Sequence, residues 1–180
     1  ETAEKILSIT NMPEGACEFL SSGSEAVEYG MRIARVLSRK PLALSFADAY
    51  FGTYGDAALR DGRNWFVYDR LSCQCNENGN GCSGDCSRFK EIPFEDIGIF
   101  ILEPGSSMGL VRFPERSLVE KIAGIVQANG GIVISNEVTT GIGRTGKWFG
   151  YQHYNIQPDI VAMGKGLGNG YPVSAVAVSE

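Results

Sequence analysis

A lysine set among glycines is the residue of this 180-residue sequence best suited to covalent chemistry. Lys165 lies between Gly164 and Gly166, directly after the apolar segment Ile160–Met163. We expect this lysine to lie against apolar surface, where the pKa of its amine falls and the amine can form a Schiff base with an aldehyde. A phosphate-binding lysine or a plain turn explains the same pattern equally well.

The run Ser22-Gly23-Ser24-Glu25 is the second candidate site, because it follows an apolar segment and opens a helical pattern. Ser22 and Glu25 have the spacing of a capping box, in which two side chains satisfy amides of the first helical turn. The amides that remain lie at the positive end of the helix and suit a phosphate, which Gly23 allows to approach the backbone. Taken alone, this motif more often marks a capped helix without a ligand.

Two further runs place polar or aromatic side chains just after apolar segments. Ser135-Asn136-Glu137-Val138 ends one such segment, and Tyr50 follows another. Ligands of α/β proteins bind outside the carboxyl ends of strands, so these side chains are candidates for one crevice. The more general role of an aromatic residue such as Tyr50 is packing in the core.

The elements that must position these side chains are short apolar runs that alternate with helical patterns. Most of the runs are continuously apolar, which is typical of strands buried on both faces of a parallel sheet. Strands that alternate with helices predict an α/β fold of three layers, with a doubly wound, mostly parallel, seven-stranded sheet. The predicted strands are Cys17–Ser21, Pro41–Phe46, Trp65–Tyr68, Ile97–Leu102, Gly131–Ser135, Ile160–Met163 and Val173–Val178, with helices over Glu25–Ser38 and Pro114–Asn129.

Composition limits the class of protein. The sequence has 16 Lys and Arg against 21 Asp and Glu, a net charge of -5, and 43% hydrophobic residues, which is typical of one folded domain. It lacks a basic cluster, so nucleic acid is not expected as a partner. No apolar run approaches the ~18 residues of a membrane span, and the opening residues lack the order of a signal peptide. We therefore expect a cytoplasmic protein without a membrane partner.

The segment 72–88 interrupts the alternation of strands and helices and has the composition of a loop. It contains four of the five cysteines, as Cys73-x-Cys75 and Cys82-x3-Cys86. Four thiols suffice for tetrahedral zinc or an iron–sulfur cluster, but the first gap is tighter than the usual spacing of about two to four residues. Free thiols or a local disulfide are the favoured alternatives, so no metal is expected.

The order of these motifs resembles that of the class III, fold-type I pyridoxal-phosphate-dependent aminotransferases, which include the acetylornithine, ornithine, 4-aminobutyrate and omega-amino acid transaminases. The resemblance rests on Phe19-Leu-Ser-Ser-Gly-Ser-Glu-Ala26, Ile101-Leu-Glu-Pro104, Ser135-Asn-Glu-Val138 and Lys165. It implies that residues 1–180 form the large, cofactor-binding domain of such an enzyme, with 72–88 as an insertion. On this resemblance, we expect the family's N-terminal segment and C-terminal small domain to lie outside these 180 residues.

The resemblance implies a cofactor and a reaction. Lys165 would hold pyridoxal 5'-phosphate as a Schiff base and then move the substrate proton. Gly23 and Ser24 would bind the cofactor phosphate through their amides. The implied reaction transfers an amino group from an amine or amino acid donor to a 2-oxo acid acceptor, and the implied full-length protein is a homodimer.

Around the cofactor ring, the resemblance implies that Tyr50 covers one face and Val138 the other, with Glu103 at the rim of the site. Asn136 stands where the family has an aspartate that contacts the pyridine nitrogen. An aspartate keeps that nitrogen protonated, which lets the ring take up electrons, whereas an asparagine is uncharged and cannot supply the same attraction. We therefore expect a protein that binds the cofactor but transaminates slowly or runs altered chemistry.

Other functions on the same scaffold stay open. The run Gly105-Ser-Ser-Met-Gly109 lacks the glutamate that gates a substrate-binding arginine in many relatives, which favours an omega-transaminase-like pocket. A racemase, aminomutase or decarboxylase remains an alternative, because the motifs bind cofactor rather than substrate. A non-catalytic relative or a fragment is a further alternative, which Asn136 favours and the intact Lys165 opposes.

Overall fold

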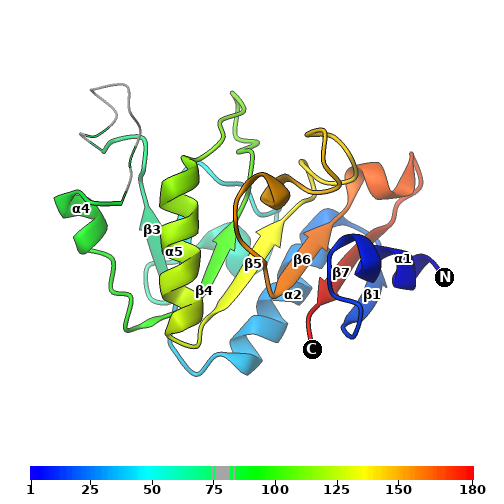
Figure 1. Ribbon diagram of the computed structural model, residues 1–180, viewed down its shortest axis with the longest axis horizontal. Coiled ribbons are helices and arrows are strands. Elements are labelled where there is room, and N and C mark those ends of the chain that lie inside the picture. The colour runs from blue at the N-terminus through cyan, green and yellow to red at the C-terminus, as the bar shows by residue number, and fades with distance from the viewer. Residues whose placement is uncertain (74, 76–81, 83) are drawn as a thin grey trace.

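The sheet of this protein has seven strands within the residues that the structure, a computed structural model, describes: 1–73, 75, 82 and 84–180. The strands lie in the order β1-β7-β6-β5-β4-β2-β3 across the sheet (Figure 1). Their bounds are β1 (Ala16–Leu20), β2 (Leu42–Phe46), β3 (Trp65–Tyr68), β4 (Ile97–Leu102), β5 (Ile132–Asn136), β6 (Ile160–Met163) and β7 (Ser174–Val178).

Helices cover both faces of the sheet, so the domain has three layers (Figure 1). Helix α2 packs against β6 and β7 on one face, and helix α5 packs against β4 and β5 on the other. The helical elements are α1 (Thr2–Ile9), α2 (Gly23–Leu37), α3 (Asp56–Leu59), α4 (Ser87–Lys90), α5 (Arg116–Ala128) and the 3-10 segments η2 (Gly150–His153) and η3 (Lys165–Gly168).

Strand direction brings the candidate residues to one edge of the sheet. β2, β3, β4, β5 and β6 pair in parallel, and β7 runs antiparallel to both β1 and β6. β1 therefore points the same way as the central strands. The carboxyl ends of β1, β2, β4, β5 and β6 lie at the same edge, where ligands of such sheets bind.

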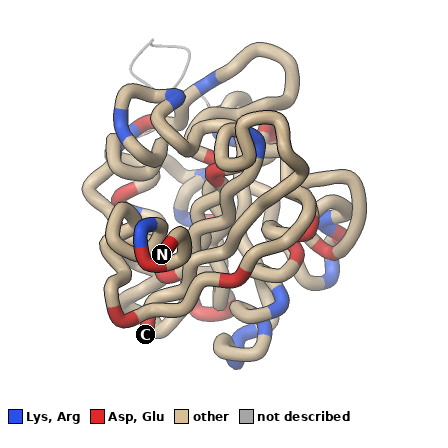
Figure 2. The backbone as a smooth tube through the Cα atoms, turned by 90° about the vertical axis from the view of Figure 1, so that its right-hand side faces the viewer, with Lys and Arg blue, Asp and Glu red and all other residues tan. Residues whose placement is uncertain are grey.

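Both ends of the chain lie on one side of the domain, beside α1, β1 and β7 (Figure 1). Figure 2 views the domain from that side and shows acidic and basic positions mixed along the backbone. This mixture agrees with the modest net charge of -5.

Two apolar layers form because successive side chains of a strand point to opposite faces. In β4, Ile99 and Ile101 belong to the core under α2, while Phe100 and Leu102 belong to the core under α5. All six residues of this strand are buried, which confirms the prediction of a central strand covered on both faces.

All seven predicted strands and both predicted helices are confirmed, with boundaries within about two residues. The prediction that most of the strands are buried on both faces is confirmed for the central ones, whereas Ala16, Glu18 and Phe19 of β1 are exposed. β1 lies at the edge of the sheet and pairs on one side only, so less of it is covered. Helices α1, α3 and α4 were not predicted from the sequence. α3 and α4 are single turns, and α1 lacks a side-chain cap.

The predicted loop over 72–88 overlaps the first two residues of α4. Residues 74, 76–81 and 83 of that segment lie outside the described part of the chain. Within the described ranges, no helix is both long and apolar enough to cross a membrane.

Candidate active site

A pocket of about 310 Å³ opens at the carboxyl edge of the sheet. Four segments that are distant in sequence meet in it: the start of α2 and the segments that follow β2, β5 and β6. It is lined by Ser22, Gly23, Ser24, Val27, Tyr50, Phe51, Gly52, Asn136, Val138, Thr139 and Lys165. The family resemblance gives seven residues a role at the cofactor, and the structure places six of them in this lining. The seventh, Glu103, lies outside it.

The first turn of α2 forms one wall of the pocket. Ser22 caps the helix: its Oγ accepts the amide of Glu25 at 3.3 Å, and a Glu25 carboxylate oxygen accepts the amide of Ser22 at 2.9 Å. The predicted capping box is therefore confirmed. The amides of Gly23 and Ser24 have no carbonyl available within the helix, and they lie at its positive end. This wall is suited to an anion.

Glycine is required at position 23 by a close approach. A Cβ on Gly23 would lie 2.5 Å from Cγ1 of Val138, a separation at which one of the two residues must move. Gly52 has a φ of +112°, and a Cβ there would lie 2.6 Å from the hydroxyl of Ser24. These two glycines let α2, the Tyr50 segment and the end of β5 approach one another around the pocket.

Asn136 ties two of the pocket segments together. It lies at the end of β5 and is 3% exposed. Its Nδ2 donates to the carbonyl oxygen of Tyr50 at 2.9 Å, and its Oδ1 accepts the amide of Val138 at 3.2 Å. The nitrogen and the oxygen of this side-chain amide are therefore both hydrogen-bonded to backbone atoms. These bonds hold Tyr50 and Val138, which line the pocket, in place.

Glu103 also holds the segment around Tyr50 in place. It lies just after β4, is 2% exposed, and accepts the amide of Tyr50 at 2.7 Å through Oε2. Its Oε1 accepts the Ser107 hydroxyl at 2.6 Å. Burial raises the pKa of Glu103, and its hydrogen bonds and the charge of Lys165 oppose that rise. Glu103 thus positions Tyr50, which lines the pocket and is 40% exposed.

Lys165 begins η3, and its Nζ donates to Oγ1 of Thr139 at 2.8 Å. Its φ of +33° is uncommon for a residue with a side chain. The expectation that this lysine lies against apolar surface, away from solvent, is wrong for the described chain, because Lys165 is exposed. Thr139 belongs to the polar run that follows β5, where the sequence predicts a ligand site, but no individual role was predicted for it.

Glu137 faces away from the pocket and anchors the neighbouring loop. It is 1% exposed and accepts the hydroxyls of Ser135 and Thr140 and the amides of Gly150 and Tyr151 at 2.6–2.9 Å. Burial raises its pKa. These contacts give Glu137 a structural role, because they connect the end of β5 to η2.

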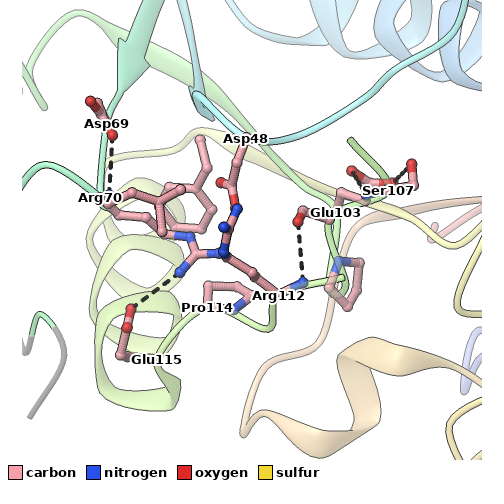
Figure 3. Close-up of polar contacts among 12 residues, drawn as sticks. Asp48, Asp69, Arg70, Glu103, Ser107, Arg112, Pro114 and Glu115 are labelled. Atoms are coloured by element: carbon pink, nitrogen blue, oxygen red, sulfur yellow. Dashed lines mark hydrogen bonds and ion pairs between the residues drawn. The ribbon is translucent and has the colours of Figure 1, made fainter. Parts of the chain in front are cut away.

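A buried arginine contacts the segment that follows β2 through Asp48 (Figure 3). Arg70 is 3% exposed and points between Asp48 and Glu115, with N–O distances of 2.6 Å and 3.8 Å. Its guanidinium also lies 5.8 Å from the centre of the Phe46 ring. Arg70 thus links the segment after β2 with the segment after β3 and the start of α5.

The fold and the pocket define an α/β domain that presents a helix N-terminus, an aromatic ring and a lysine to one cavity. The chain belongs to the class-III aminotransferases, since the model of that family matches residues 66–180. The resemblance and the three-layer α/β fold inferred from the sequence are confirmed. Members of this family depend on pyridoxal phosphate.

Several known proteins are similar to this chain over nearly its whole length. A leucine/methionine racemase of Thermococcus litoralis is 28% identical over 97% of this chain and 44% of its own length. An acetylornithine aminotransferase of Methanosarcina mazei is 30% identical over 98% of this chain and 44% of its own length. A solved S-selective transaminase of an Arthrobacter species has a TM-score of 0.80 and 33% identity, covering 98% of this chain and 45% of that one. The chain thus spans less than half the length of these relatives.

Proposed function

We propose that this chain is the cofactor-binding part of a pyridoxal-phosphate-dependent aminotransferase. The observation that carries the proposal is the convergence of Lys165, Tyr50 and the first turn of α2 on one pocket. In this proposal residues 1–180 form the large domain, with 72–88 as an insertion. The protein would transfer an amino group from a small amine or amino acid to a 2-oxo acid. It would be cytoplasmic and a homodimer, and the family resemblance supports the dimer.

The residues of the pocket fit the cofactor at its phosphate end. The first-turn amides of α2 carry partial positive charge, and Gly23, which has no side chain, lets a ligand approach them. The Ser24 hydroxyl accepts the amide of Thr53 at 3.3 Å, so this side chain is already oriented by the pocket wall. We propose that Gly23 and Ser24 bind the phosphate.

The residues around the middle of the pocket fit a flat ring. Tyr50 and Val138 line it from different segments, and Asn136 lies between those segments at the end of β5. We propose that the Tyr50 ring and the Val138 side chain pack on the two faces of the cofactor, with Asn136 near its pyridine nitrogen. Glu103 would then act through Tyr50, whose amide it accepts.

When bound, pyridoxal phosphate supplies an aldehyde that reacts with an amine and a ring that takes up electrons as a substrate proton leaves. Lys165 would hold the cofactor and then accept or return that proton at Nζ. The Thr139 hydroxyl, 2.8 Å from Nζ, would orient the amine. Asn136 carries no charge and donates its Nδ2 to Tyr50, so it would bind the ring without the electrostatic support that a carboxylate provides. Transfer would therefore be slow.

Borohydride reduction tests the proposal directly. The chain is incubated with pyridoxal phosphate, reduced and digested, and pyridoxyl-lysine is located by mass spectrometry. We expect the label on Lys165, its loss in Lys165→Ala, and its retention in Lys147→Ala, an exposed control. Label spread over several surface lysines, or none, would contradict the assignment of the site.

A racemase is the second candidate, because the Thermococcus litoralis relative that covers 97% of this chain is named as one. The two functions differ in their need for an acceptor. A transaminase converts L-leucine to its 2-oxo acid only when a second oxo acid such as pyruvate is supplied, whereas a racemase forms D-leucine without it. Chiral analysis of both incubations separates the candidates.

A further inference from the structure

Four cysteines gather outside the candidate active site, in the connection between β3 and β4. They are Cys73, Cys75, Cys82 and Cys86, and their sulfur atoms all lie within 4.8 Å of one another. Two separations are 3.4 Å, between Cys73 and Cys86, and 3.7 Å, between Cys82 and Cys86. None of the four is joined in a disulfide. The pair Cys73 and Cys75 thus lies next to the pair Cys82 and Cys86, although Cys73 and Cys86 are 13 positions apart in the sequence.

We propose that these four cysteines bind a single zinc ion as a tetrathiolate site. Zinc–sulfur bonds of about 2.3 Å in a tetrahedron place the sulfurs about 3.8 Å apart, and two sulfurs on one zinc cannot be more than about 4.6 Å apart. The separations of 3.4 Å and 3.7 Å lie within about 0.4 Å of the tetrahedral value, and the upper limit of 4.8 Å on the others exceeds the maximum by only about 0.2 Å. An iron–sulfur cluster inserts several atoms between its thiolates, so sulfurs this close favour a single ion.

Hydrogen-bond donors surround the sulfurs, as a site of negative thiolates requires. The amide of Gly84 donates to Cys82, and the amide of Phe89 donates to Cys86. The Tyr68 hydroxyl lies 3.5 Å from the sulfur of Cys82 and 3.8 Å from that of Cys86. The donors lie in β3 (Tyr68), in α4 (Phe89) and at Gly84 between them, so the surrounding structure orients the sulfurs.

The cluster is part of the hydrophobic core under α5. Cys73 and Cys82 are 3% and 0% exposed, and both belong to the apolar group that includes Tyr68 and Phe89. Four protein ligands would leave no open position on the ion, which is typical of a structural rather than a catalytic zinc site. The ion would therefore fasten the long connection after β3 to the edge of the sheet.

A contact from α5 supports the same role. Nζ of Lys121 donates to the carbonyl of Gly84 at 2.9 Å and to Asp85 at 2.6 Å, and it lies 5.1 Å from the centre of the Phe89 ring. Lys121 thus brings a positive charge to the segment that carries Cys82 and Cys86. A cation at this place offsets part of the charge of four thiolates around a divalent ion.

The test measures metal in the whole chain, purified under reducing conditions from zinc-supplied medium. We expect about one zinc per chain by elemental analysis, and cobalt in its place with the absorption of a tetrahedral thiolate site. Cys75→Ser and Cys86→Ser are each expected to lower the zinc content at least about fivefold. Cys17→Ser, in β1, is the control and is expected to retain it.

Several results would overturn the proposal. Wild-type chain with four free thiols and no zinc would do so, as would two disulfides detected as a loss of mass. Iron in place of zinc would refute the choice of ion, and equal loss of metal in Cys17→Ser would show unspecific binding. The cobalt spectrum of the wild-type chain decides the ligand set without any variant, so a variant that fails to fold does not remove the test.

Discussion

The side-chain amide of Asn136 donates to the main-chain carbonyl of Tyr50 across 2.9 Å, although 86 residues separate the two in sequence. The same side chain accepts the amide of Val138, so its donor and acceptor ends are both used. An aspartate could fill only the accepting role, because an ionised carboxylate has no hydrogen to donate. The asparagine therefore has a structural function in addition to any contact with a cofactor.

Asn136→Asp is expected to lower the free energy of unfolding by about 1–3 kcal/mol at pH 7, because a carboxylate would face the Tyr50 carbonyl without a proton between them. The loss should shrink at low pH, where the new carboxyl group is protonated and can donate to that carbonyl. Urea unfolding at both pH values measures this change. Asn155→Asp, at an exposed position, is the matched control. Equal stability of the two variants at pH 7 would contradict the structural role of Asn136.

The same variant tests the chemical role of the asparagine in the proposed function. A carboxylate at position 136 would supply the negative charge that a pyridinium nitrogen requires, so Asn136→Asp is expected to speed the amino-transfer half-reaction. Stopped-flow absorbance with an amino donor measures the rate. A half-reaction that is already fast and is unchanged by the substitution would refute the slow chemistry that we propose.

Gly23→Ala is expected to destabilise the chain and to weaken binding of pyridoxal phosphate. The new methyl would meet Val138 at 2.5 Å and push apart the walls of the pocket. Thermal unfolding and cofactor titration measure the two effects. Gly124→Ala makes the same chemical change within α5, where no atom lies within 4 Å of the new Cβ. That control is expected to stabilise the chain by about 0.5–1 kcal/mol, since alanine favours a helix.

Stability should fall with rising pH through Glu103. Burial raises the pKa of this carboxyl, so the folded chain holds its proton more tightly than the unfolded chain does. The stabilising contribution is complete below the ordinary glutamate pKa of about 4.3 and is lost as the pH rises through the folded value. Glu103→Gln can keep the contacts to Tyr50 and Ser107 without this titration.

Urea unfolding of Glu103→Gln between pH 4 and neutrality measures this dependence, with Glu14→Gln as the control for loss of an exposed charge. The stability of Glu103→Gln relative to the wild type is expected to increase as the pH rises. A constant difference across the range would show that Glu103 titrates alike in the folded and unfolded chains.

Arg70→Met is expected to cost about 2–4 kcal/mol of unfolding free energy, because it removes a buried cation and leaves Asp48 and Glu115 without that partner. Arg116→Met removes the exposed ion pair with Glu120 and should leave stability close to that of the wild type. Denaturant unfolding of both variants compares the buried ion pairs of Arg70 (Figure 3) with the exposed pair of Arg116. Equal costs would mean that burial of Arg70 carries no energetic weight.

Much of this fold was predictable because its signals are local. Continuous apolar runs such as Ile97–Leu102 identify central strands, since both faces of these strands are covered. The capping box of Ser22 and Glu25 identifies the start of α2, since its two hydrogen bonds join residues three apart. Edge strand β1 and the short helices were less predictable, because tertiary contacts rather than periodicity decide their burial and length.

The sequence by itself determined the family, the three-layer α/β class and six of the residues that line the pocket, because these depend on residue types and their order along the chain. Only the tertiary structure decided how those residues are used. It shows that Asn136 binds the carbonyl of Tyr50, that Glu103 positions Tyr50 rather than lining the pocket, and that Lys165 is exposed beside Thr139. The physical reason is that hydrogen bonds and burial join strand ends far apart in sequence, and such distances are defined only once the sheet has assembled.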